Sequence, residues 1–242
     1  MAQPSHSSSG AQPPLNIVIE PATLDDVDAL GAMAGAAFKT DTHTQLKALF
    51  DGENAHEEGW KEAMKSWIPH PKVDVIVARE VESGRLVGHV AWVRRGFQGD
   101  VDYPLDEPDE LEVKSGPKTV ADLKNFSSNG MTSWVKKLMP EGTRCRFMTG
   151  INVDPAYQGR GVGSRLMQWG TDKADSEGIF CWVSSSMGGK SAFEKQGFRE
   201  VGRVEANLDE YAEGKQRPLE EGSKDGSWGN YIWYYMKREP KV

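Results

Sequence analysis

The chain has 242 residues and a formal net charge of −7 at pH 7, so its length suits one large domain and its acidic balance offers no basic stripe to a nucleic acid. Its two cysteines, Cys145 and Cys181, lie in apolar runs and resemble neither a disulfide framework nor a metal cluster. They predict buried thiols in a reducing, cytoplasmic compartment, with the nucleus left open, and no apolar stretch reaches the roughly 18 residues of a membrane span.

The N-terminal part is expected to hold a tail, a strand and a helix. Residues 1–14 (MAQPSHSSSGAQPP) have neither the apolar stretch of a secretory signal nor the arginines of a mitochondrial presequence, so we expect a disordered tail before a single domain over residues 15–242. Leu15 to Glu20 is predicted to form a short strand. Thr23 and Asp26 then resemble a capping box, and the following helix should end near Phe38. Its predicted apolar face consists of Val27, Leu30, Ala34 and Ala37.

The next segments favour a helical pair and a hairpin. Residues 42–67 have a helical pattern interrupted at Asp51-Gly52, which predicts two short helices, ended by Pro69 and Pro71, that form a lid. Val73 to Val81 and Arg85 to Arg94 are rich in β-forming residues, and Ser83-Gly84 separates them. This arrangement is typical of an antiparallel hairpin.

An acidic segment follows. Residues 99–114 contain seven carboxylate side chains, one lysine and two prolines, and they predict an insertion at about 97–118. A solvated loop is the favoured interpretation, and steering of a cationic amine towards the protein is the alternative. Thr119 to Met139 is predicted to be helical with a break around Asn129-Gly130.

The C-terminal half predicts a parallel crossover. Arg144 to Val153 should form a strand, Gly161 to Glu177 a helix, and Ile179 to Val183 a second, parallel strand. A helix at 190–196, a strand from Phe198 and a last strand at 231–236 complete an α+β domain with a mixed sheet. In the last strand, the aromatic residues favour a place in the core over an aromatic acceptor pocket; they are Tyr231, Trp233, Tyr234 and Tyr235.

Glycines are concentrated where the crossover helix begins. The first N–H groups of a helix have no partner within it and carry the positive end of its dipole, so they attract an anion such as phosphate. Glycine lets the loop turn and lets the anion approach the backbone. The phosphate-binding pattern of P-loop nucleotide sites fails here, because no lysine and hydroxyl residue follow Gly163 in the required arrangement. The pattern of dinucleotide-binding folds also fails, because Ser164 stands where that pattern needs a glycine. The candidate anion-binding residues are Gln158, Gly159, Arg160, Gly161, Val162, Gly163 and Ser164.

Two motifs carry a resemblance to a known family. The stretch INVDPAYQGRGVGSRLMQW, which ends at Trp169, resembles the acetyl-CoA-binding motif of the GNAT superfamily of N-acetyltransferases, V-x-P-x-[YH]-[QR]-[GR]-x-G-[IVL]-[GA]-x-x-L. SAFEKQGF, ending at Phe198, resembles the family's A-x-x-x-Y-[EK]-K-x-G-F ending. The resemblance implies the GNAT acyl-CoA N-acyltransferase fold, in which a splayed central mixed β-sheet is flanked by helices.

The resemblance also implies a site. Main-chain groups of Ile151, Asn152 and Val153 would pair with the pantetheine arm of acetyl-CoA, the amides from Gln158 to Ser164 would hold its pyrophosphate, and Phe193 would pack in the same cofactor-binding site. A primary amine, expected to belong to a small molecule, would attack the thioester. Acetyl-CoA is the expected cosubstrate, and no metal is implied.

Catalytic residues stay unassigned. Many family members have tyrosine at the position of Phe193, where its hydroxyl can protonate the leaving thiolate, so water or a serine among residues 184–186 would replace it, or no acid is needed. Candidate bases by type alone are the carboxylates of the acidic segment, Glu53, Glu57, Glu58, His43, His56 and His89. The alternatives are a catalytically silent coenzyme A sensor, a protein-lysine acetyltransferase and, last, an O-acetyltransferase. A homodimer is left open.

Overall fold

The structure is a computed structural model that describes residues 15–97, 116–219 and 225–241. The predicted tail at 1–14 and most of the predicted insertion at about 97–118 lie outside these residues. Within them, seven strands form one sheet in the order β1-β2-β3-β4-β5-β7-β6, and only β4 and β5 are parallel. The predicted α+β class with a mixed sheet is therefore confirmed. Among the described helices, none combines the length and the apolar character needed to cross a bilayer.

The first half of the sheet follows the predicted pattern. β1 (Ile17–Pro21), β2 (Val73–Glu80) and β3 (Leu86–Arg95) pair in antiparallel fashion, so the predicted hairpin is confirmed. The capping box is also present, since the Thr23 N–H donates to Asp26 Oδ2 at 2.9 Å. It opens the 3-10 turn η1 (Leu24–Asp26), which leads into α1 (Val27–Ala37).

Helices α2 (Thr42–Asp51) and α3 (Ala55–Trp67) flank Gly52, whose positive φ of 103° ends the first of them. Each helix buries a side chain completely, Leu46 on α2 and Met64 on α3. Met64 joins the core that α1 forms with one face of the sheet, whereas Leu46 joins a separate cluster beneath β6 and β7. Both helices are thus part of the packed structure, and their predicted movement as a lid stays a prediction.

Helix α4 (Val120–Leu138) is continuous, so the predicted break around Asn129-Gly130 is wrong. Gly130 faces the Val204 and Tyr235 side chains, and Trp134 stacks on Tyr235 with ring centroids 4.8 Å apart. This packing against the sheet stabilises the helix by more than the roughly 1 kcal/mol that a glycine in a helix costs.

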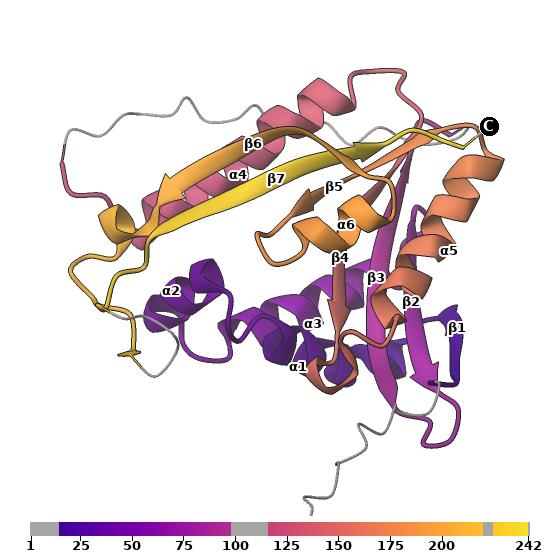
Figure 1. Cartoon of the computed structure of the whole chain (residues 1–242), viewed down its shortest axis with the longest axis horizontal. Coiled ribbons are helices and arrows are strands. Elements are labelled where there is room, and N and C mark those ends of the chain that lie inside the picture. The colour runs from indigo at the N-terminus through magenta and orange to yellow at the C-terminus, as the bar shows by residue number, and fades with distance from the viewer. Residues whose placement is uncertain (1–14, 98–115, 220–224, 242) are drawn as a thin grey trace, which may run out of the picture.

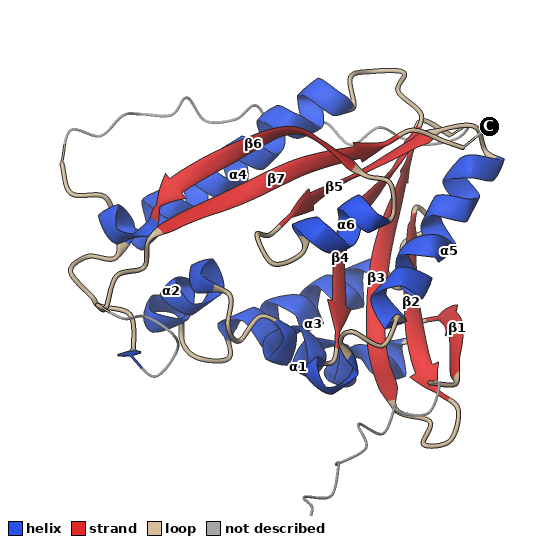
Figure 2. Ribbon diagram, in the orientation of Figure 1, coloured by secondary structure: helices blue, strands red, loops and turns tan. Residues whose placement is uncertain are grey.

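The crossover is formed as predicted by β4 (Cys145–Val153), α5 (Val162–Ser176) and β5 (Phe180–Ser185). Helix α5 and the short α6 (Lys190–Lys195) cover one face of the sheet, and α1, α3 and α4 cover the other (Figure 2). β6 (Arg199–Asn207), the turn η3 (Leu208–Tyr211) and β7 (Asn230–Arg238) complete the chain. Both cysteines are buried free thiols, and burial raises the pKa of each to about 12.

Candidate functional site

Strands β4 and β5 separate halfway along their length. Their parallel pairing ends at Met148 and Val183, beyond which β4 pairs only with β3, and β5 only with β7. Figure 1 shows the two strands starting together and then diverging. The separation begins where Thr149 is an extra residue in β4, a bulge opposite the Ala91/Trp92 step of β3. The facing edge of β4 therefore offers unpaired main-chain groups to an extended ligand, as the predicted splayed sheet requires.

The chain then turns sharply into α5. After the 3-10 turn η2 (Pro155–Tyr157), Gly159 and Gly161 adopt φ values of 72° and 85°, and Gly161 is the residue that caps the helix. A Cβ at either glycine would have open space around it, so the positive φ is what requires glycine there. The side chain of Gln158 ties this loop back to β4 by donating to the Val153 carbonyl at 3.2 Å.

Three amides at the start of α5 lack acceptors. The first helical hydrogen bond runs from Arg165 N to the Gly161 carbonyl, and within the described part of the chain the N–H groups of residues 162–164 donate to no protein atom. Together with the helix dipole, they form a site of positive potential at the end of the opening between β4 and β5.

A cavity of about 770 Å³ joins these two features. It extends from the β4 edge, past the start of α5, to the loop before α6. Every predicted cofactor-binding residue except Arg160 lines it: Ile151, Asn152, Val153, Gln158, Gly159, Gly161, Val162, Gly163, Ser164 and Phe193. The Arg160 guanidinium lies instead over the Tyr157 ring, 5.1 Å from its centroid.

Phe193 forms part of the cavity wall. It is buried on α6 and makes an edge contact with Phe198, with ring centroids 5.5 Å apart. Of the three serines considered as substitutes for a tyrosine hydroxyl, only Ser186 lines the cavity. Ser184 lies opposite Tyr235 in the β5–β7 ladder, and Ser185 donates to the carbonyl of Ser186 at 2.9 Å.

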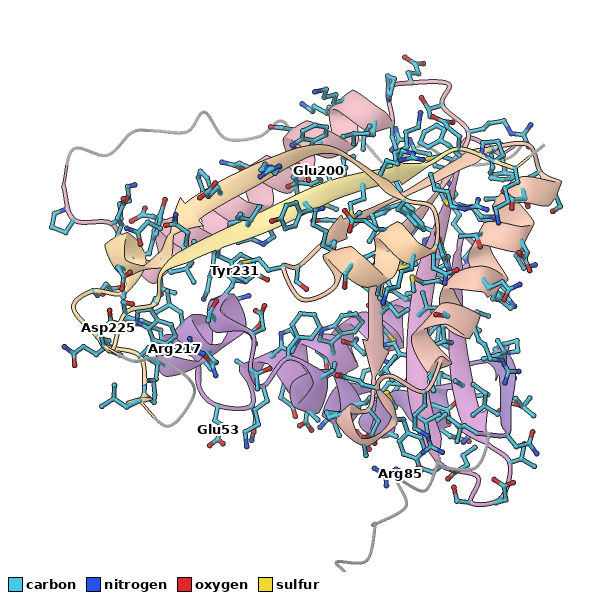
Figure 3. All side chains as sticks on the ribbon, viewed as in Figure 1. Glu53, Arg85, Glu200, Arg217, Asp225 and Tyr231 are labelled. Carbon is cyan, nitrogen blue, oxygen red and sulfur yellow. The ribbon has the colours of Figure 1, made fainter. Side chains whose placement is uncertain are left out.

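The far end of the cavity contains residues that sequence reasoning missed. Asp41 caps α2 by accepting from Thr44 N at 2.9 Å, and its other carboxylate oxygen accepts from the Tyr231 hydroxyl at 2.8 Å. Phe38 and Tyr231 line the cavity beside it. Figure 3 shows Tyr231 on β7, above α2. An aspartate directly before a helix is a local capping signal that the sequence contains, but no local signal shows the bond between Asp41 and Tyr231, which are 190 positions apart. Tyr231 is both a core residue and a cavity residue.

None of the candidate bases among the described residues lines the cavity, and the three histidines have a lowered pKa. Burial lowers the pKa of His43 and His89 to about 3 and that of His56 to about 4, so all three are neutral at physiological pH. Glu57 and Glu58 pair with Lys61, and Glu53 points away from α2 and α3 into solvent (Figure 3). The acidic segment lies outside the described residues. No group of side chains in the described ranges could hold a metal ion.

His89 gives the protein a testable dependence on pH. It is fully buried, and its Nε2 lies 3.1 Å from the side-chain amide nitrogen of Asn152, with which it shares a hydrogen bond. Because the folded pKa lies below the unfolded one, the stabilisation is complete above about pH 6.5 and is lost as pH falls towards 3. Between about pH 7 and pH 5, His89→Gln should lose about 2 kcal/mol less unfolding free energy than the parent. Urea titration at each pH measures the unfolding free energy, and an equal loss for His89→Gln and the parent between the two pH values would contradict this.

Comparison with known proteins agrees with this architecture. The family model of the acetyltransferase (GNAT) family matches residues 43–198, more than half of the chain. Comparison with curated proteins gives no significant sequence match.

Three solved structures show the same fold. A polyamine N-acetyltransferase from Drosophila melanogaster superposes with a TM-score of 0.59 at 15% identity, over 93% of this chain and 100% of that one. A mosquito arylalkylamine N-acetyltransferase-like protein gives 0.58 at 15%, over 93% and 100%. A mutant agmatine N-acetyltransferase without ligand gives 0.58 at 14%, over 91% and 98%. By its sequence match and its fold, this chain belongs to the GNAT family and is an acetyl-transferring enzyme.

Proposed function

We propose that the protein transfers the acetyl group of acetyl-CoA to the primary amine of a small molecule. The observation that carries this proposal is the continuity of a single cavity between the open edge of β4 and the free amides of α5. A strand edge suits the amide groups of a pantetheine arm, and helix amides suit a pyrophosphate. The two lie in the order in which coenzyme A carries those groups.

The chemistry needs few protein groups. The pantetheine arm would extend along Ile151 to Val153 and place the thioester where β4 and β5 diverge. An N–H of that β4 segment would stabilise the oxyanion that forms when the neutral amine attacks the carbonyl carbon. The carbon–sulfur bond then breaks, coenzyme A leaves as thiolate, and the amine nitrogen loses a proton to water. Positioning of the two reactants supplies most of the acceleration. The acceptor would approach from the end lined by Phe38, Asp41 and Tyr231.

The direct test follows free thiol release from acetyl-CoA in the presence of a panel of amines. Acceptor-dependent release, together with an acetylated product identified by mass, is the expected result. Calorimetry on the same preparation measures coenzyme A binding. Tight binding without acceptor-dependent release would favour a sensor that binds coenzyme A and does not catalyse, the second candidate, which the absence of a hydroxyl at Phe193 supports.

Phe193→Tyr separates these candidates further. A thiolate is a tolerable leaving group, and Ser186 or water can supply a proton, so kcat should stay within about threefold of the parent. The ring remains in the same wall, and the KM for acetyl-CoA should not change. A rise in kcat of about 100-fold or more would show instead that a missing acid limits the parent enzyme.

A further inference from the structure

A second cavity, of about 330 Å³, lies between α2 and α3. One wall is aromatic, because the rings of Trp60 and Trp67 meet edge to face with centroids 5.9 Å apart. Trp60 is held in place from two sides. Its indole N–H donates to His56 Nε2 at 3.1 Å, and its ring packs so tightly on Gly150 of β4 that a Cβ there would come within 2.3 Å. This wall is therefore fixed before any ligand binds.

The opposite wall carries a lysine whose ammonium group is in direct contact with no carboxylate of the described residues. Lys47 lines the cavity from α2 and makes no hydrogen bond or ion pair with any described residue. Asp51, one turn along, is already paired with Lys124, whose Nζ lies 2.5 Å from Asp51 Oδ1. Burial lowers the pKa of Lys47, the charges of Asp51 and Asp41 oppose that shift, and neither neighbouring histidine carries a charge at neutral pH. A partly buried ammonium that no carboxylate contacts directly is costly, and an anionic group placed against it would offset that cost.

This second cavity adjoins the acyl-donor cavity. Phe38 lines the donor cavity, and its ring centroid lies 4.9 Å from that of His56, which lines the second. Trp60 packs on Gly150, the residue before Ile151 in the β4 edge. One layer of side chains therefore lies between the two spaces, and a ligand whose amine reaches the end of β4 would have to pass between Phe38 and His56 to place its other end against Lys47.

We propose that the cavity between α2 and α3 binds the far end of the acceptor, an apolar chain or ring that ends in an anionic group such as a carboxylate paired with Lys47. This inference rests on the proposed function and narrows its substrate class. The aromatic wall would cover the apolar part, and the ammonium would select against acceptors that carry a second positive charge. A diamine or polyamine would place a like charge beside Lys47 and is the disfavoured class.

The test compares acceptors that differ only in the charge of the far end. The acceptors are amino carboxylates of increasing chain length and the aromatic amino acid 4-(2-aminoethyl)benzoate. Each is matched to a diamine of the same length, and kcat/KM is measured for every compound. The parent should prefer the best carboxylate over its matched diamine by about tenfold or more, because the carboxylate forms a charge-assisted pair where the diamine places a like charge. Lys47→Met should abolish this preference, and Lys47→Glu should reverse it. Lys65→Met, an exposed lysine of α3, is the control and should change neither value.

Two results would overturn the inference. One is a preference that persists unchanged in Lys47→Met and Lys47→Glu when thermal unfolding shows both variants to be folded; the other is a parent enzyme that prefers diamines. Binding of 3-phenylpropanoate, which has no amine, is measured in parallel by calorimetry and needs no catalysis. It should weaken about tenfold or more in Lys47→Met. Acetylation of amines with no dependence on Lys47 in either assay rejects the subsite alone. Lys47-dependent binding without acetylation of any amine rejects the proposed function alone.

Discussion

Replacing Gly161 with valine is expected to weaken acetyl-CoA binding by about 100-fold or more while the protein stays folded. Gly161 holds a φ of 85° at the start of α5, and a β-branched residue in that region costs about 1–3 kcal/mol. The loop can relieve this strain only by turning the amides of residues 162–164 away from the position where a pyrophosphate would lie. If it does not move, the new side chain occupies the open space that the ligand needs. Calorimetric titration with acetyl-CoA measures the change.

The matched control lies at the other end of the same helix. Gly178 also has a positive φ, 63°, and also has open space where a Cβ would be, but it does not line the cavity. Gly178→Val therefore adds comparable strain without approaching the ligand, and acetyl-CoA should bind it as it binds the parent.

A second variant removes strain from the comparison. Gly163 has an ordinary φ, and a Cβ there would make a normal contact, 3.5 Å from Val153 Cγ2, so Gly163→Leu adds bulk to the anion site alone. Its affinity should fall as that of Gly161→Val does. Unchanged affinity in both site variants, or an equal loss in Gly178→Val, would contradict a role for these amides in binding.

Gly170→Val is expected to lower the free energy of unfolding by about 3 kcal/mol or more. Gly170 is buried in the middle of α5, where a Cβ would lie 2.1 Å from Cε2 of Trp92. The Trp92 ring is completely buried in the sheet and has no space into which it can move. The added methyl groups must therefore push the helix away from the sheet. Urea denaturation followed by tryptophan fluorescence measures the change.

Gly59→Val is the comparison for this second effect. Gly59 also lies inside a helix, α3, but nothing surrounds the position where its Cβ would be, so unfolding free energy should change by less than about 0.5 kcal/mol. Similar stabilities for the two variants would show that contact with Trp92 does not position α5. Because α5 carries the free amides, a folded Gly170→Val protein should also bind acetyl-CoA more weakly than the parent.

The donor half of the site was readable from the sequence because it consists of main-chain groups on consecutive residues. The strand that ends at Val153, the glycine turn and the start of α5 at Val162 follow one another directly in the sequence, and local rules fix their conformations. The same holds for the hairpin of β2 and β3 and for the capping box at Thr23. In each case the residues that determine the structure are neighbours in the chain.

The acceptor half was decided by the tertiary structure, because its contacts join residues far apart in the chain. Asp41 meets Tyr231, Trp60 fills the space above Gly150, and α4 remains continuous through Gly130 because it packs on β6 and β7. No local pattern shows that Asp51 pairs with Lys124 and not with Lys47 on its own helix. The sequence therefore determined how an acyl donor can be held by backbone amides. Only long-range packing, which places side chains from separate segments around one space, decided what an acceptor would meet.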